Sequence, residues 1–342
     1  MKSSFVLLSS IVVLGARVET CCAYDYEGHR LVNQLALGAL PPDFPAFVKT
    51  EPNRERIAFL AGEPDRWRNS SEPSFQHINA PDHFIDLEDL APYGLEPASL
   101  TAFRYEFVAQ MAKAVAAKPE RFPTVDPSKD PPRTRGLPGF LPWTINEYYA
   151  KLRSGFSSLR AFEEGGTPEE IANAQQDVVY VMGLLGHFVG DASQPLHTTR
   201  HFNGWVGNNL GGYTTNRTFH AWIDGGYLTK VGMPNASALQ PKLHPARLLW
   251  TASSESGNAP AFARAMEFIL EQHRLVEPLY LLEKEGKLAG DTELGRQGLV
   301  FMEGQLVKGA QLLSDLWYSA WREAPPDRFL QSQLAKRKLS HP

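Results

Sequence analysis

The sequence has almost no cysteine. Its 342 residues include two cysteines, Cys21 and Cys22, which stand side by side near the amino terminus. If a leader that contains them is removed, the rest of the chain has no thiol. Disulfide bonds and thiolate metal ligands are then excluded, so a metal site would need imidazole and carboxylate ligands.

The sequence also lacks a strong charge of one sign and a long apolar run. Lysine and arginine number 34, aspartate and glutamate number 38, and the net charge is −4. This balance excludes broad neutralisation of duplex phosphates, although metal ions could supply local positive charge against a nucleic acid. No stretch reaches the roughly eighteen apolar residues of a membrane span. The composition is typical of a soluble globular protein.

The amino terminus has the pattern of a secretory signal peptide. Lys2 supplies the positive start, residues 5–16 are mostly apolar, and Cys21-Cys22-Ala23 offers small residues before a cleavage point. The pattern predicts a signal peptide over residues 1–23 and a secreted or periplasmic protein. A disordered or docked amino-terminal helix and lipidation of Cys21 or Cys22 remain alternatives.

The rest of the pattern is helical nearly throughout. Apolar residues recur at helical spacing in five segments that we predict as helices: residues 31–39, 100–118, 168–190, 262–275 and 306–321. The third has a clear start, with Thr167 as cap, Pro168 at the first position and Glu170 three residues after the cap. Runs of alternating β-branched residues are scarce, which predicts a mainly α fold.

Two long segments are predicted as loops. Residues 118–142 contain seven prolines, and residues 198–218 are rich in glycine and asparagine. Long loops inside a compact domain are usually functional. We expect one helical domain over residues 24–330, followed by a basic tail over residues 331–342 that frays.

A dense cluster of potential metal ligands lies in the middle of the chain. His187 and Asp191 are four residues apart, as are His220 and Asp224, so each pair would share one helix face. His197 follows the first pair after a proline turn. One such pair is weak support for a site, because solvated helix faces often produce it. Two pairs and a third histidine within 38 residues favour metal binding.

Three further candidates lie upstream. They are His29 after a glycine, Asp65 before Arg66, and His83 at the start of a His-Phe-x-Asp run that contains Phe84 and Asp86. Taken alone, His29 would be a core or capping histidine and Asp65 a surface carboxylate paired with an arginine. His77 would be as eligible as His83, and only the run that follows selects His83.

The order of these motifs resembles a zinc-dependent superfamily. It comprises single-strand-specific nucleases (3′-nucleotidase/nucleases) and bacterial zinc phospholipase C. The similarity extends over roughly two hundred residues, and its most specific piece is Gly190-Asp191-x-x-Gln194-Pro195-Leu196-His197. The resemblance implies a single-domain helical bundle of the phospholipase C/zinc nuclease type with a trinuclear zinc cleft.

The resemblance also implies the ligands of three zinc ions. The implied set is Tyr24, His29, Asp65, His83, His187, Asp191, His197, His220 and Asp224. One zinc would be held by Asp65, His83 and His187, and Asp191 would bridge it to a second. The second would also be held by His29 and by the amino-terminal residue through its α-amino group and carbonyl. Cleavage after Ala23 would make Tyr24 that residue, where the family usually has Trp.

The remaining implied ligands hold the third zinc, and their spacing bears on the branch of the superfamily. His197, His220 and Asp224 would be these ligands. The 23-residue step from His197 to His220, and an aspartate as the last carboxylate, resemble the nuclease branch. In that branch, the residues that match Phe84 and Asp86 bind substrate, by stacking on a base and by bonding its edge. Phospholipases can show a similar run, so this pair does not decide the branch.

The implied function is a secreted zinc-dependent phosphodiesterase. It would be an endonuclease that hydrolyses single-stranded DNA and RNA to 5′-nucleotides, with 3′-nucleotidase activity. Metal-activated hydroxide would attack the phosphate, and Asp65 would act as the catalytic residue that orients it. Two alternatives are a zinc-dependent phospholipase C acting on phospholipid and a secreted zinc-binding protein without turnover. No stable protein partner is implied.

Overall fold

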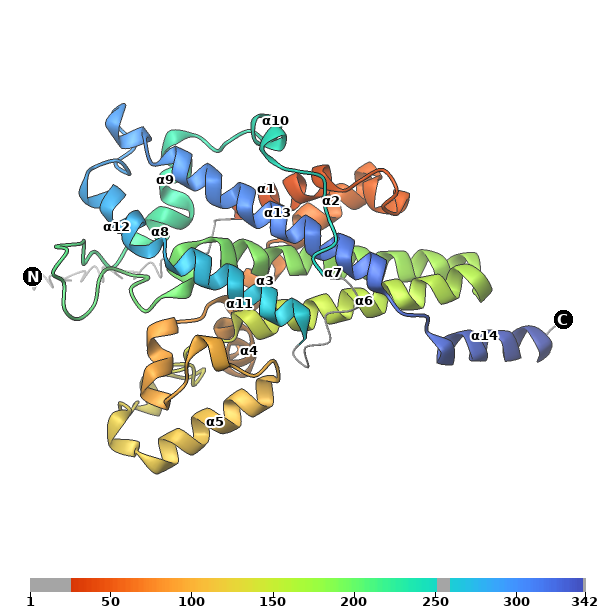
Figure 1. The fold of residues 1–342 in the computed structure, drawn as a ribbon, viewed down its shortest axis with the longest axis horizontal. Coiled ribbons are helices and arrows are strands. Elements are labelled where there is room, and N and C mark those ends of the chain that lie inside the picture. Colours follow the sequence, from red (N-terminus) through yellow and green to blue (C-terminus); the bar gives the residue numbers. More distant parts are fainter. Residues whose placement is uncertain (1–25, 251–258, 341–342) are drawn as a thin grey trace, which may run out of the picture.

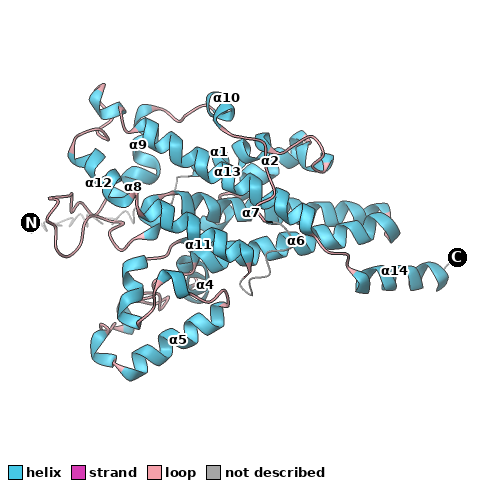
Figure 2. Cartoon of the chain, in the orientation of Figure 1, coloured by secondary structure: helices cyan, strands magenta, loops and turns pink. Residues whose placement is uncertain are grey.

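Helices account for nearly all of the regular structure. The computed structural model describes residues 26–250 and 259–340 (Figures 1 and 2). Within these ranges the only strand-like pairing is a single bridge between Ile85 and Gly139. The prediction of a mainly α fold is therefore confirmed. The predicted leader, Tyr24 and the two cysteines lie outside the described residues, and no described helix is both long and apolar enough to span a membrane.

Helix α7 is the centre of the bundle. It spans Pro168–Ser193, and its second half is buried almost without interruption. Around it pack α1 (Tyr26–Ala39), α2 (Glu51–Leu60), α6 (Leu141–Gly165), α11 (Pro260–His273) and α13 (Leu299–Glu323). Their inward faces form one continuous hydrophobic core. Residues from both ends of the sequence therefore meet on one helix.

Eight further described helices complete the fold. They are α3 (Glu63–Arg68), α4 (Pro73–Asn79), α5 (Arg104–Ala117), α8 (Phe219–Ala221), α9 (Tyr227–Val231), α10 (Ala236–Leu239), α12 (Val276–Lys284) and α14 (Arg328–Ser340). Helix α5 lies in a lobe beside the bundle, together with the proline-rich segment that follows it (Figure 1). That segment contains only short 3-10 turns, as the prediction of a loop requires.

The predicted start of α7 is confirmed in atomic detail. The Thr167 hydroxyl accepts a hydrogen bond from the Glu170 backbone N–H, and the Glu170 carboxylate accepts one from the Thr167 N–H at 2.8 Å. The helix continues to Ser193, three residues past the predicted end. Asp191 is therefore inside the helix, one turn after His187.

The prediction of a frayed tail is wrong. Residues 328–340 form helix α14, which packs against α6. Arg337 donates two hydrogen bonds of 2.7 and 2.8 Å to the Glu170 carboxylate. Leu334 is buried, with its side chain close to Gly165. These contacts join positions far apart in the sequence, so the local composition of the tail could not reveal them.

Close packing of α1 against α7 depends on glycine. A Cβ atom at Gly186 would lie 1.7 Å from the Asn33 side-chain oxygen, and one at Gly190 would lie 2.6 Å from Nδ1 of His29. The Asn33 amide is fixed by hydrogen bonds to the carbonyls of Ile57 and Gly183. The missing side chains thus let α1 approach closely enough to place His29 beside α7.

Substitution of Gly186 by alanine tests this packing. We expect Gly186→Ala to lower the free energy of unfolding by about 1–3 kcal/mol, because the added methyl group cannot fit against an anchored amide. Gly304→Ala on α13 is the matched control, since a Cβ there meets nothing within 4 Å. The control should be neutral or slightly stabilising. Equal urea midpoints for Gly186→Ala and the parent protein would contradict this account.

Candidate metal centre

Helix α7 supplies the two central residues of the site. His187 and Asp191 lie one turn apart and are fully buried. The ring of His29, from α1, stacks on the ring of His187 with centroids 4.0 Å apart. Nε2 of His29 lies 3.5 Å from Oδ1 of Asp191. We call His29, His187 and Asp191 the second group, because the resemblance assigns His29 to the second zinc.

A first group forms where α3 and a 3-10 turn meet α7. It consists of Asp65 from α3, His83 from the turn Ala80–His83, and His187, which it shares with the second group. Nδ1 of His83 lies 2.9 Å from Nε2 of His187 and 3.0 Å from Oδ2 of Asp191. Oδ1 of Asp65 lies 3.8 Å from that His83 nitrogen. Asp191 is therefore a member of the second group that also contacts a residue of the first.

The third group joins His197, His220 and Asp224. Nε2 of His220 lies 2.9 Å from Oδ2 of Asp224 and 3.0 Å from Nε2 of His197. Asp224 stands in a π-helical turn, Trp222–Gly226, between α8 and α9. Such turns occur frequently at functional sites. Nδ1 of His197 is 3.8 Å from Oδ1 of Asp191, so the third group adjoins the other two.

Backbone carbonyls fix the protonation of two histidines. Nδ1 of His187 lies 2.7 Å from the Ala61 carbonyl, and Nδ1 of His197 lies 2.6 Å from the His83 carbonyl. A carbonyl can only accept, so each Nδ1 carries the proton and each Nε2 presents its lone pair to a group. Metal-binding histidines commonly have such an outer hydrogen bond.

The three groups fit metal ions. In each group the ligand atoms lie within 4.8 Å of one another, and all the residues are buried. Tetrahedral ligands about 2.0–2.1 Å from a zinc ion would be roughly 3.3 Å apart, similar to the separations given above. Oδ1 of Asp65 and Oδ1 of Asp191 are buried and accept no hydrogen bond among the described residues. A cation would satisfy these oxygens.

Burial without a cation disfavours charge in this cluster. It raises the pKa of Asp191 well above its usual range, lowers the pKa of His83, and lowers the pKa of His187 to about 4. Burial would also raise the pKa of Asp224, but its interactions with the nearby His220 and His197 outweigh burial and lower it. Neutral imidazoles are the form that binds metal, and a bound cation would keep Asp191 ionised.

The predicted ligands come together wherever the structure describes them. Eight of the nine, from His29 to Asp224, form the three groups, while Tyr24 lies outside the described residues. His77, which the sequence left equal to His83, is exposed instead and contacts the Pro132 carbonyl.

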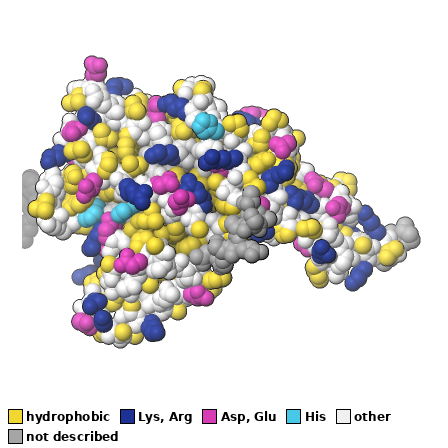
Figure 3. Space-filling model, in the orientation of Figure 1, with side chains coloured by type: hydrophobic (Ala, Val, Ile, Leu, Met, Phe, Trp, Pro, Cys, Tyr) yellow, Lys and Arg dark blue, Asp and Glu magenta, His cyan; other side chains and the backbone are white. Residues whose placement is uncertain are grey.

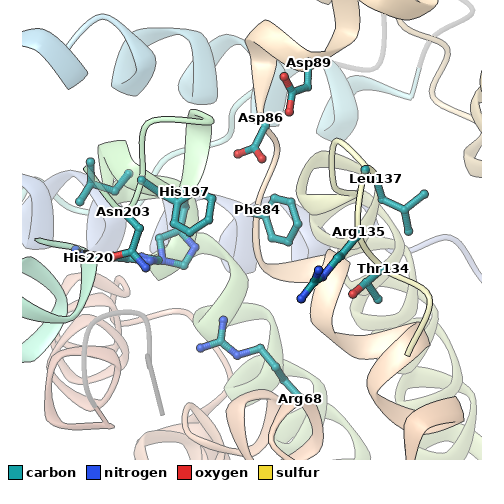
Figure 4. Close-up of a pocket in the computed structure, with 13 residues that line it drawn as sticks. Arg68, Phe84, Asp86, Asp89, Thr134, Arg135, Leu137, His197, Asn203 and His220 are labelled. Carbon is teal, nitrogen blue, oxygen red and sulfur yellow. Dashed lines mark hydrogen bonds between the residues drawn. The ribbon is translucent and has the colours of Figure 1, made fainter. Parts of the chain in front are cut away.

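An open pocket adjoins the third group. Its volume is about 340 Å³, and its lining includes His197, His220, Phe84 and Asp86 (Figure 4). The ring of Phe84 is half-buried, and Asp86 is buried with Oδ1 accepting no hydrogen bond among the described residues. Burial raises the pKa of Asp86 well above its usual range. The two residues predicted to bind substrate thus share a pocket with two metal-ligand candidates.

Two residues that support the site, Gln194 and Glu88, were not identified from the sequence. Gln194 donates a 2.5 Å hydrogen bond to Oδ1 of Asp224 and accepts one from the Leu196 N–H. Glu88 accepts hydrogen bonds from the Thr199 hydroxyl and the Arg200 N–H, which holds the chain just after His197. Gln194 stood within the most specific motif, so it could have been found. Glu88 had no comparable signal.

Comparisons with known proteins add no family name. No protein-family model matches the chain, and a search of curated proteins found no match. The similarity to zinc nucleases and phospholipases therefore rests on the order of the motifs.

Metal removal tests the three groups together. A ligand present at about 100 times its Kd stabilises a protein by about 2.7 kcal/mol, and each kcal/mol shifts the melting temperature by about 2–4 °C. We expect chelation of bound divalent metal to lower the melting temperature by about 5 °C or more. Re-addition of zinc should restore it. An unchanged melting temperature after verified loss of metal would contradict a metal centre in the core.

Proposed function

We propose that this chain is a secreted zinc-dependent phosphodiesterase that cleaves single-stranded DNA and RNA and removes 3′-phosphates from nucleotides. The observation that carries the proposal is the convergence of three adjoining His/Asp groups beside the pocket that Phe84 lines. Contiguous polynuclear sites next to an open pocket suit phosphate chemistry better than the closed four-ligand cages of structural zinc.

Three zinc ions would occupy the three groups. The first group would hold one, and Asp191 would connect it to a second held by His29 and the amino-terminal Tyr24. The third group would hold the last. When bound, zinc supplies positive charge against the phosphate and makes hydroxide available near neutral pH.

Asp65 is suited to orient the attacking water. It extends from α3 to the edge of the first group and is 7% exposed, more than His83 or His187, which are fully buried. Its Oδ1 accepts no hydrogen bond among the described residues, and Nη2 of Arg68 lies 3.3 Å away. Arg68 also lines the pocket. Asp65 can therefore accept a proton or hydrogen bond from water while Arg68 restrains its carboxylate.

Phe84 and Asp86 are suited to bind a base. An exposed aromatic face binds any base by stacking, which grips single strands without reading their sequence. A carboxyl with a raised pKa keeps its proton to higher pH, so Asp86 can donate to a base edge as well as accept from it. The face seen in Figure 3 mixes positive and negative side chains.

Substrate assays with three outcomes test the proposal. We expect release of acid-soluble nucleotides from single-stranded DNA, lost on chelation and restored by zinc. Phosphocholine release from phosphatidylcholine without nucleotide release would instead assign the phospholipase activity. Tight zinc binding with neither product would show that the chain only binds zinc.

Replacement of Asp65 by asparagine tests its role in turnover. Asp65→Asn should leave the fold intact and lower kcat on single-stranded DNA by about 100-fold or more, because a carboxamide is a poor proton acceptor. Asp315→Asn is a matched control, since Asp315 is a buried carboxylate on α13 that accepts a hydrogen bond from the Arg247 backbone N–H. A kcat for Asp65→Asn near that of the control would remove Asp65 from the mechanism.

A further inference from the structure

A loop from the proline-rich segment forms the wall of the pocket opposite the third group. Thr134, Arg135, Gly136 and Leu137 all line the pocket. In Figure 4, Phe84 lies between this loop and the histidines His197 and His220. The loop therefore faces the metal centre across the ring proposed to stack on a base.

The loop is held in shape by several contacts. The buried carboxylate of Asp130 accepts hydrogen bonds from the N–H groups of Thr134 and Arg135, at 3.2 and 3.0 Å. The Tyr93 hydroxyl donates to the Gly136 carbonyl at 2.8 Å. Arg133 has a φ of 57°, a left-handed conformation that is uncommon for a residue other than glycine. Such backbone persists only where surrounding contacts impose it.

This shape directs one positive side chain into the pocket. Figure 4 shows Arg135 extending from the loop toward Phe84. Arg135 is exposed and forms no ion pair among the described residues. Two acidic residues also line the pocket: Asp89 is paired with Arg200 at 3.2 Å, and Asp86 is buried and forms no ion pair with Arg135. The guanidinium is therefore available to an anionic group that enters the pocket.

We propose that Arg135 binds the 5′-phosphate of the nucleotide whose base stacks on Phe84. The inference rests on the proposed function, which places the 3′-phosphate of that nucleotide at the metal centre. The 5′-phosphate then leaves the sugar on the side away from the metal, where the loop lies. A guanidinium presents paired N–H donors that match two phosphate oxygens. Arg135 would be a specificity-determining residue.

Arg135 would make the pocket distinguish between two classes of substrate. A nucleotide inside a polynucleotide has phosphates on both sides of its sugar, whereas a 3′-mononucleotide has one. Arg135 would add binding energy only for the first kind. The pocket would therefore favour cleavage within chains over dephosphorylation of 3′-mononucleotides.

Two thymidine nucleotides that differ in one phosphate test this. Release of inorganic phosphate would be measured from deoxythymidine 3′,5′-bisphosphate and from deoxythymidine 3′-monophosphate with the zinc-loaded protein. We expect kcat/KM to be about tenfold higher for the bisphosphate, a typical effect for one charge-assisted hydrogen-bonded contact, with the difference mainly in KM. Arg135→Gln should reduce that ratio to near one, and Arg135→Lys should restore part of it.

Arg133→Gln is the matched control. It removes the same charge from the same loop, but Arg133 is exposed and is not part of the pocket wall. Its ratio should stay near that of the parent protein. Equal ratios in Arg135→Gln and the parent would overturn the inference while leaving phosphatase activity in place. Hydrolysis of neither nucleotide by the parent would overturn the proposed function, and the inference with it.

Discussion

The buried carboxylate of Asp191 is the point on which the rest of the structure depends. Four histidines surround it, with nitrogens 3.0–3.8 Å from its oxygens: His29, His83, His187 and His197. A carboxylate with no exposure is costly unless positive charge accompanies it, and burial lowers the pKa of His83 and His187, so these two imidazoles do not supply that charge. Divalent cations bound at the adjoining groups would resolve this conflict. A metal centre is therefore the most economical explanation for a polar cluster in a hydrophobic bundle.

The scaffold serves to bring remote segments to that carboxylate. Small residues on α7 let α1 approach, and Asn33 ties the two helices to α2. The carbonyls of Ala61 and His83 set the tautomers of His187 and His197, and Gln194 orients Asp224. Each contact links a ligand to a different helix or turn. Rigidity of this kind would hold a metal site in place more precisely than mobile loops would.

The spacing of residues in the sequence predicted part of the candidate site, but it could not predict the contacts between distant segments. Four-residue steps placed His187 with Asp191 and His220 with Asp224, because helix geometry is periodic. The choice of His83 over His77 depended on a resemblance, and packing between distant segments decides it: His83 meets α7, whereas His77 faces solvent. Glu88 and helix α14 act through partners more than a hundred residues away. The π-helical turn that carries Asp224 had no signal in the sequence either.

The most direct measurement of the central claim is an anomalous difference map at the zinc absorption edge, from crystals of the purified protein. The account predicts a peak within each of the three groups, among the side chains around Asp65, Asp191 and Asp224. A protein that crystallises with this fold in zinc-containing solution and shows no peak at any of these carboxylates would contradict it.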